Sequence, residues 1–321
     1  MELTVIVPTH ERKGRLTKLL DSLASQTRKG FEVIVVDDAS ADGTPDAVKE
    51  YAKKFPLDIT LLTQGKKGPA AARNLAIRES SAETVLFLND DVTADPRLVE
   101  EHLRFHEKSP DTSTVGTILS SAESGWLVAS GPEISASSII AGGDGIPFFY
   151  YITANALTEK RHLMDAGLFD KSFEEPAGED VDMGYRLHKA GVRLQMNDKA
   201  IVSHDHPLDA KAFASRQRLH GRGLARFVSK HPEFTNEYPV RIEPTVESAL
   251  ADASKALAEA YGLKISPGML KAASFNPPAM RAIGAVVQRQ LPEKRSEMKY
   301  ALQRLCWAYH LSRGYYGEAG R

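Results

Sequence analysis

Two adjacent carboxylates, Asp90 and Asp91, directly follow the apolar run at residues 84–88 and Asn89. An unbroken apolar run of this length predicts a strand buried on both faces. Open α/β sheets place their ligands at the carboxyl ends of such strands. Two acids there are costly unless they face water or a cation, and a hard divalent ion such as Mg²⁺ accepts carboxylates together with substrate phosphates. The segment is therefore either a metal site or a solvated, acid-rich turn.

Polar residues also close two earlier apolar runs. Thr9 follows the run at residues 3–7, and Asp38 lies just after the run at residues 33–36. Apolar runs that alternate with helical patterns predict a parallel sheet with right-handed crossovers. The carboxyl ends of neighbouring strands in such a sheet meet at one crevice, so we expect these polar residues to converge there.

Hydrophobic periodicity predicts the elements that must position these residues. Four leucines between residues 16 and 23 recur at the spacing of one helix face. Asp95 is expected to cap a helix that starts at Pro96. The expected strands are residues 3–7, 33–36, 59–63, 84–88, 148–152, 192–196 and 200–202, and the other expected helices include residues 44–55, 70–78 and 179–190.

The pattern changes near residue 211 and becomes helical. Several arginines decorate a segment that ends near His231, and they either clamp an anion, rest on anionic lipid or form a solvated helix face. Residues 233–244 resemble a linker, and further helical stretches follow it. We expect one domain over residues 1–210 and a helical C-terminal region of unassigned role over residues 211–321.

Composition limits the class of protein. The 321 residues are 42% hydrophobic and 26% charged, as in an ordinary globular protein, and the net charge of -1 argues against a nucleic-acid binder. The single cysteine, Cys306, excludes an internal disulfide and fits a reducing compartment. No apolar run is long enough to span a membrane, and the N-terminus lacks signal-peptide features. We expect a cytoplasmic protein, with peripheral contact at the inner face of the membrane left open.

Six motifs, in this order along the chain, resemble those of the inverting nucleotide-sugar glycosyltransferases of family 2. The resemblance covers about residues 1–210 and implies a GT-A fold, which is a Rossmann-like, mixed and mainly parallel α/β sheet flanked by helices. The motifs are Val5-Ile6-Val7-Pro8-Thr9, Val35-Val36-Asp37-Asp38-Ala39-Ser40, Gly68-Pro69-Ala70-Ala71-Ala72-Arg73-Asn74, Asn89-Asp90-Asp91, Gly178-Glu179-Asp180-Val181-Asp182 and Ala200-Ile201-Val202-Ser203-His204.

The resemblance implies which residues bind the nucleotide. Pro8, Thr9 and Glu11 match the loop that contacts the nucleoside. Asp38 matches the acid that pairs with the imide edge of the base, and Arg73 matches a position near the nucleotide. The resemblance also implies a nucleoside-diphosphate sugar donor, with UDP as the default and GDP or dTDP left open.

It further implies the metal ligands and the base. Asp91 stands at the ligand of a Mg²⁺ or Mn²⁺ ion, with Asp90 beside it on the nucleotide side. His204 matches a histidine that joins the metal or the diphosphate, and His206 is its rival. Asp180 stands at the general base that deprotonates the acceptor hydroxyl. Its place at a helix start favours the carboxylate anion and weakens it as a base, unless proton transfer is late.

Two departures from the family pattern leave the base of the nucleotide open. Asn89 replaces the first acid of the DxD motif, so its contact with the ribose is an open question, and His10 with Glu11 stands where Tyr-Asn is common. The Gln-x-x-Arg-Trp motif of processive synthases is absent, which favours transfer of a single sugar to a glycan, lipid-linked or other acceptor, as in polysaccharide biosynthesis. The sugar, acceptor and oligomeric state stay open.

Other classes of protein fit part of the sequence. Paired acids after an apolar strand also mark phospho-acceptor signalling modules, although that class leaves Asp180 and His204 without a role. A sugar-nucleotide binder without turnover is a further alternative. A nucleotidyltransferase fits less well because the N-terminal loop lacks a glycine-rich phosphate cradle.

Overall fold

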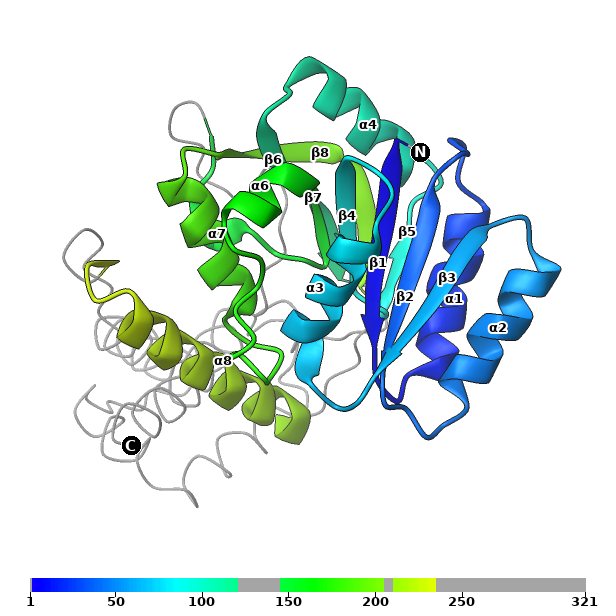
Figure 1. Ribbon diagram of the computed structural model, residues 1–321, viewed down its shortest axis with the longest axis horizontal. Coiled ribbons are helices and arrows are strands. Elements are labelled where there is room, and N and C mark those ends of the chain that lie inside the picture. The colour runs from blue at the N-terminus through cyan, green and yellow to red at the C-terminus, as the bar shows by residue number, and fades with distance from the viewer. Residues whose placement is uncertain (1, 121–144, 205–209, 235–321) are drawn as a thin grey trace, which may run out of the picture. The chain divides into compact units, whose positions relative to one another are not determined.

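The computed structural model describes residues 2–120, 145–204 and 210–234. The chain divides into two compact units, of which the first comprises residues 1–124 and 133–206 and the second comprises residues 125–132 and 207–321 (Figure 1). The domain boundary expected at residue 210 stays a prediction. The predicted linker beyond Phe234, the helical stretches after it and His206 lie outside the described residues.

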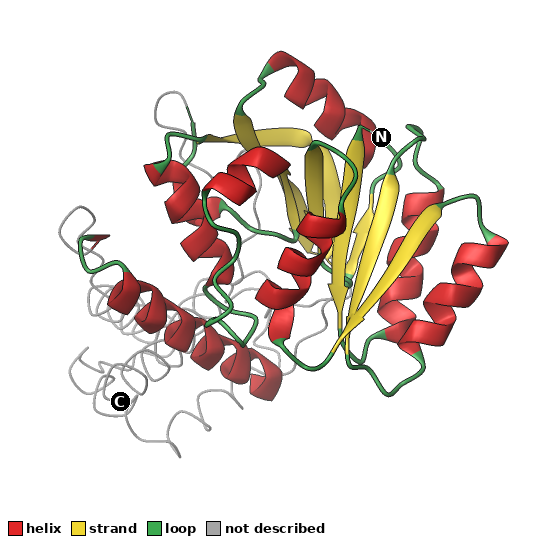
Figure 2. Ribbon diagram, in the orientation of Figure 1, coloured by secondary structure: helices red, strands yellow, loops and turns green. Residues whose placement is uncertain are grey.

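The first unit is built on an eight-stranded sheet with the order β3-β2-β1-β4-β7-β6-β8-β5 (Figure 2). Strands β3, β2, β1 and β4 run parallel, β7 is antiparallel to both of its neighbours, and β6 is parallel to β8. This mixed, mainly parallel sheet confirms the predicted fold class. The strands are β1 (Leu3–Thr9), β2 (Glu32–Asp38), β3 (Asp58–Gln64), β4 (Thr84–Leu88), β5 (Val92–Ala94), β6 (Thr112–Ser120), β7 (Asn155–Glu159) and β8 (Arg193–His204).

The strand order changes direction at β1, because β2 and β3 lie on one side of it and β4 lies on the other. Right-handed connections then move the crossover helix to the other face of the sheet. Helix α3 packs beside β1 and β2 in front of the sheet in Figure 1, whereas α1 and α2 pack against each other. The point between β1 and β4 is therefore the topological switch point, where α/β sheets bind ligands. The helices of this unit are α1 (Lys13–Ala24), α2 (Thr44–Lys54), α3 (Gly68–Glu79), α4 (Leu98–Lys108), α6 (Lys160–Asp165) and α7 (Glu179–Lys189).

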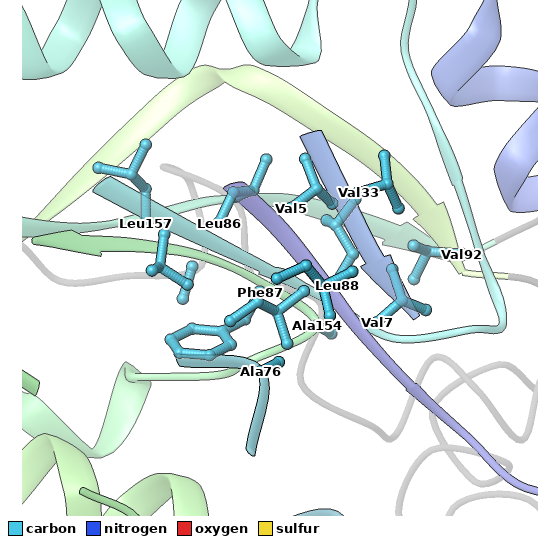
Figure 3. Packing of buried hydrophobic residues seen from close by; sticks show 14 of the residues in the cluster. Val5, Val7, Val33, Ala76, Leu86, Phe87, Leu88, Val92, Ala154 and Leu157 are labelled. Carbon is cyan, nitrogen blue, oxygen red and sulfur yellow. The ribbon is translucent and has the colours of Figure 1, made fainter. Parts of the chain in front are cut away.

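The core lies on both faces of the central strands. Val5, Val33 and Leu86 are fully buried and stand side by side in the register of β1, β2 and β4 (Figure 3). Phe87 meets Phe169 edge to face, with the ring centroids 5.4 Å apart. Burying each such side chain contributes roughly 1.5–3 kcal/mol, so these strands form a rigid base for the loops at their carboxyl ends.

One predicted strand is wrong. Residues 148–152 form the 3₁₀ helix η2 (Phe148–Tyr150), and the strand β7 begins only at Asn155. This aromatic run packs against α7 and not within the sheet, and the ring centroids of Phe148 and Tyr185 are 5.2 Å apart. A Cβ atom on Gly184 would lie 2.5 Å from the Phe148 carbonyl oxygen, so this close approach requires glycine.

Two further boundaries differ from the prediction. The strands expected at residues 192–196 and 200–202 are one strand, β8, with an irregularity where the pairing passes from Asn197 to Ile201. Helix α4 begins at Leu98 and not at Pro96, because a turn follows β5, in which Asp95 accepts the Arg97 N–H with its side chain and the Leu98 N–H with its carbonyl.

The second unit contributes one described helix, α8 (Ala210–Lys230), which confirms the helix expected from residue 211 to about His231. Its end is packed, since the ring of Phe227 lies 5.0 Å from that of Phe234 and 4.9 Å from that of His231. Among the helices that the structure describes, none combines the length and apolar character needed to cross a membrane.

Candidate active site

The predicted site residues at the ends of β1, β4 and β8 come together at the switch point. Thr9 ends β1 and donates its hydroxyl to Asp90 Oδ2 at 2.8 Å. Asp90 and Asp91 form the turn after β4. His204 ends β8, and its Nε2 lies 3.1 Å from Asp91 Oδ1. The convergence expected from the parallel strands is therefore present.

Arg12, at the N-cap of α1, holds both acids. Its Nη1 atom donates to Asp90 Oδ1 at 2.9 Å and to Asp91 Oδ2 at 2.7 Å. The side chains of Asp90 and Asp91 are only 7% and 4% exposed, whereas that of Arg12 is 38% exposed. Arg15 Nη1 lies 3.8 Å from Asp91 Oδ2. The two acids are thus desolvated and depend on cationic partners from α1 and its N-cap.

The two acids share Arg12 but differ in their other partners. Asp90 receives Thr9 on one oxygen and Arg12 on the other. Burial raises the pKa of Asp90, the Arg12 guanidinium opposes that rise, and the neighbouring Asp91 adds to it. Asp91 instead faces an imidazole, and a carboxylate beside an imidazole is a donor set that Mg²⁺, Mn²⁺ and similar ions accept. The residues present therefore fit a divalent ion held by Asp91 and His204.

Asp38 holds the start of α3. Its Oδ1 accepts from the Lys67 backbone N–H and from Gln64 Nε2, both at 2.8 Å, and its Oδ2 accepts from the Gly68 N–H at 2.9 Å. A carboxylate offers about four acceptor positions, so one remains on Oδ2 for the imide of a base. The nearby turn is capped by Asp37, which accepts the Ser40 N–H at 3.1 Å.

A second pair of acids opens α7. Asp180 accepts from the N–H and the hydroxyl of Thr153, each at 3.1 Å. Thr153 comes two residues before Asn155, which pairs with Leu88 at the carboxyl end of β4. Asp180 therefore lies at the same edge of the sheet as Asp90.

Arg73 pairs with Glu179, the other acid of this pair. Its Nη1 lies 2.9 Å from Glu179 Oε1 and 3.9 Å from Asp180 Oδ1, and its guanidinium stacks over Phe169. Both Arg73 and Glu179 are 4% exposed. Burial raises the pKa of Glu179 to about 8, with Asp180 adding to the rise and Arg73 opposing it. The structure thus places Arg73 against the acids of α7, in contact with Glu179 and near the carboxylate predicted as the base.

The remaining predicted residues shape the loop after β1. Glu11 is exposed and has a left-handed backbone, with φ at 53°. Its Oε1 accepts the Ala41 N–H at 2.7 Å, which ties this loop to the loop after β2. Pro8 pairs with Val36 in the sheet, and Asn89 is half-buried just before the acids.

Sequence reasoning missed three residues of the site, namely Arg12, Gln64 and Thr153. None belongs to an acidic or histidine motif. Arg12 lies four residues after Pro8 and four residues before Leu16, the first leucine of the predicted helix face, so its position between a strand and a helix was the only available signal. The roles of Gln64 and Thr153 depend on contacts between segments far apart in the chain, which periodicity does not report.

A third cluster of acids lies away from the site. Asp111, Glu159 and His162 bring ligand atoms within 4.8 Å of one another. Glu159 pairs with Thr84 at the amino end of β4, so the cluster is at the opposite edge of the sheet. Arg161 pairs with both acids, and its Nε lies 2.6 Å from Glu159 Oε2. The carboxylates there already have a cationic partner.

The mixed sheet with its flanking helices has the GT-A class of α/β fold. Residues 4–166 match the family model described as Glycosyl transferase family 2, and the chain belongs to that family. Membership argues against the signalling-module interpretation.

The similar proteins include a relative and two solved structures. The chain is 31% identical to the pre-mycofactocin glycosyltransferase of Mycobacterium tuberculosis, over 73% of this chain and 49% of that protein. It is 20% identical to the mannosyltransferase of Pyrobaculum calidifontis, solved with GDP-Man and Mn²⁺, with a TM-score of 0.61 over 96% and 85% of the two chains. It is 20% identical to S. aureus TarS 1-349, solved with UDP, with a TM-score of 0.53 over 100% and 92%. The two structures support the fold, and the chain spans about half of the curated relative.

Proposed function

We propose that this chain transfers one sugar, with inversion, from a nucleoside-diphosphate sugar to a hydroxyl group of a glycan, lipid-linked or other acceptor, and that it needs a divalent metal ion. The observation that supports this proposal is the meeting of Asp91 and His204 at the switch point, with Asp180 at the same edge of the sheet. Residues 38, 91, 180 and 204 are thus gathered at one end of the parallel strands.

Asp91 and His204 would hold Mg²⁺ or Mn²⁺. When bound there, the ion supplies a Lewis acid for the charge of the departing diphosphate. Asp90 is held by Thr9 and Arg12 and fixes the turn that presents Asp91. The mannosyltransferase that shares the fold was solved with Mn²⁺, which agrees with this assignment.

Asp180 would take the proton from the acceptor hydroxyl as that oxygen attacks the anomeric carbon. The two hydrogen bonds from Thr153 fix the direction of the carboxylate, and Arg73 approaches it from the other side. Fixed orientation is the requirement for a general base, which typically contributes about 10²–10⁴ in rate. A single displacement on the face opposite the diphosphate inverts the anomeric centre.

Asp38 would read the base through the acceptor position left on Oδ2. A ring N–H beside a carbonyl occurs in uracil, thymine and guanine, so this contact alone allows UDP, dTDP or GDP. UDP remains the proposed nucleotide, and TarS, which shares the fold, was solved with it. The Pro8 to Glu11 loop, joined to the loop after β2, would close over the nucleoside.

The test distinguishes the proposed metal ligand, Asp91, from the proposed general base, Asp180. Calorimetry with UDP, GDP and dTDP, with and without Mn²⁺, should find one nucleotide whose binding requires the ion. Asp91→Ala should abolish the ion-dependent part. Asp180→Asn should keep it, while transfer from the matching sugar nucleotide falls by about 10²-fold or more. The exposed Asp58→Asn is the matched control.

Ion-dependent binding that persists in Asp91→Ala would contradict the metal site. Near-normal transfer by Asp180→Asn would exclude Asp180 as the base.

A further inference from the structure

We propose that Arg12 is a built-in counter-ion of Asp90 and Asp91, which a divalent ion must displace from Asp91 and which then pairs with the diphosphate of the donor. This proposal rests on the metal site proposed above and adds a residue and a coupling to it. It makes the binding of ion and nucleotide mutually dependent.

The contacts of Arg12 place one cationic atom between two carboxylates. Nη1 lies 2.9 Å from an oxygen of Asp90 and 2.7 Å from an oxygen of Asp91. Asp91 has only two oxygens, and His204 lies at 3.1 Å from the other one. An ion ligated by Asp91 therefore meets the guanidinium at one oxygen and the imidazole at the other.

The divalent ion and the Arg12 guanidinium cannot both bind Asp91, because both are positively charged. Charge interactions at contact distance are strong where the dielectric is low, and the side chain of Asp91 is 4% exposed. A divalent ion beside Asp91 repels a guanidinium that stays on the same carboxylate. Arg12 loses its bond to Asp91 more readily than the buried acid can move, because its own side chain is 38% exposed.

Arg12 starts from the N-cap of α1, at the edge of the sheet where the diphosphate would lie. Phosphate oxygens suit arginine, whose planar fork donates two parallel hydrogen bonds. Once displaced, Arg12 gains a new partner only when the donor is present. By linkage, the nucleotide then raises the affinity for the ion by the same factor as the ion raises the affinity for the nucleotide.

The experiment measures Mn²⁺ binding by calorimetry without nucleotide, and again with saturating UDP or the nucleotide found above. Arg12→Gln removes the competing charge, so Mn²⁺ alone should bind about tenfold more tightly than to the unchanged protein. The increase in Mn²⁺ affinity caused by the nucleotide should shrink at the same time. Arg15→Gln is the matched control, because Arg15 lies 3.8 Å from the same oxygen and should change either value less.

Unchanged or weaker binding of Mn²⁺ alone to Arg12→Gln would overturn the proposal. Arg12→Lys, which keeps the charge but not the fork, should retain weak Mn²⁺ binding and lose part of the coupling to nucleotide. If the Gln variant does not fold, the Lys variant decides, and full coupling in it counts against the proposal. Adding Asp91→Ala to Arg12→Gln identifies the site: binding that survives this double substitution refutes the metal site and not the role of Arg12 alone.

Discussion

Three pairs of adjacent acids line this edge of the sheet, and their partners give the members of each pair different tasks. Within each pair, the two acids have different sets of partners. Asp37 caps its own turn, Asp90 is held by Thr9 and Arg12, and Glu179 is buried against Arg73. The second members are Asp38, Asp91 and Asp180.

Sequence motifs predicted roles for Asp90 and for the second members of these pairs, but not the different partners of the two acids in each pair. Position after an apolar run predicted that the acids would be at the site. Which acid stays buried is decided by partners such as Arg73, which is 106 residues from Glu179 along the chain. Glu179 pairs with this buried arginine, which gives it a supporting position.

The raised pKa of Glu179 predicts a pH dependence of stability. An ordinary glutamate titrates near pH ~4.3 in the unfolded chain, so between there and about 8 the folded protein binds more protons. The stabilising contribution of protonated Glu179 is complete at low pH and is lost as the pH rises through about 8. Glu179→Gln, which cannot ionise, should lack this loss. The melting temperature of Glu179→Gln should therefore rise relative to that of the unchanged protein as the pH increases from 5 to 9, because only the unchanged protein can ionise residue 179 in this range.

The exposed Glu50→Gln is the control for this prediction, because Glu50 lies on the open side of α2. Asp90 also has a raised pKa, but it is present in all three proteins and cancels in the comparison. Parallel melting curves across this pH range would show that Glu179 does not carry the buried proton.

At the level of elements, buried strands were predictable where they are apolar on both faces. The β1, β2 and β4 predictions match within two residues at each end, and so does the prediction for β3, a partly exposed edge strand. Strand β6 (Thr112–Ser120) was missed because it is buried yet rich in hydroxyl groups. Its hydroxyls are satisfied by partners from distant segments, such as the bond between Ser113 and Thr158 at 3.1 Å. Apolar and polar residues do not alternate along such a strand, so its sequence lacks the pattern that predicts a strand.

Gly68 tests how α3 is positioned, since it begins α3 and its N–H donates to Asp38 at the end of β2. Its φ is +80°, and a Cβ atom would lie 2.2 Å from the Glu174 carbonyl oxygen. Gly68→Ala should lower the free energy of unfolding by roughly 2–5 kcal/mol, because left-handed strain and overpacking add. It should also weaken nucleotide binding, because the Gly68 N–H is a partner of Asp38. Urea unfolding and calorimetry measure the two effects.

Gly30 provides the matched control. It also has a positive φ, +85°, but a Cβ atom there has no neighbour within 4 Å. Gly30→Ala should therefore cost only about 1–2 kcal/mol of left-handed strain and leave nucleotide binding unchanged. Equal losses of stability in the two variants would mean that the loop carrying Glu174 yields to the added methyl group.

At the scale of the whole molecule, the sheet carries histidines and acids at both of its edges, and only one edge is expected to bind a metal. At the carboxyl edge, Asp91 and His204 are the proposed ligands, and the competing arginine comes from the N-cap of α1. At the amino edge, Glu159 and His162 lie in the cluster that Arg161 already neutralises. Sequence motifs predicted the acids and the histidine at the carboxyl edge, whereas the cluster at the amino edge is brought together only by the topology of the chain.

His204→Ala and His162→Ala therefore make a matched pair for metal binding. With nucleotide present, Mn²⁺ should raise the melting temperature of the unchanged protein and of His162→Ala alike, because binding to the folded state stabilises it. His204→Ala should lose most of that rise, since Asp91 would then lack the imidazole that lies 3.1 Å away. Chelation of Mn²⁺ should reverse the rise wherever it occurs. A rise lost in His162→Ala but kept in His204→Ala would mean that the metal binds at the amino edge. There the ion could link α6 to β7, but it could not reach a diphosphate at the switch point.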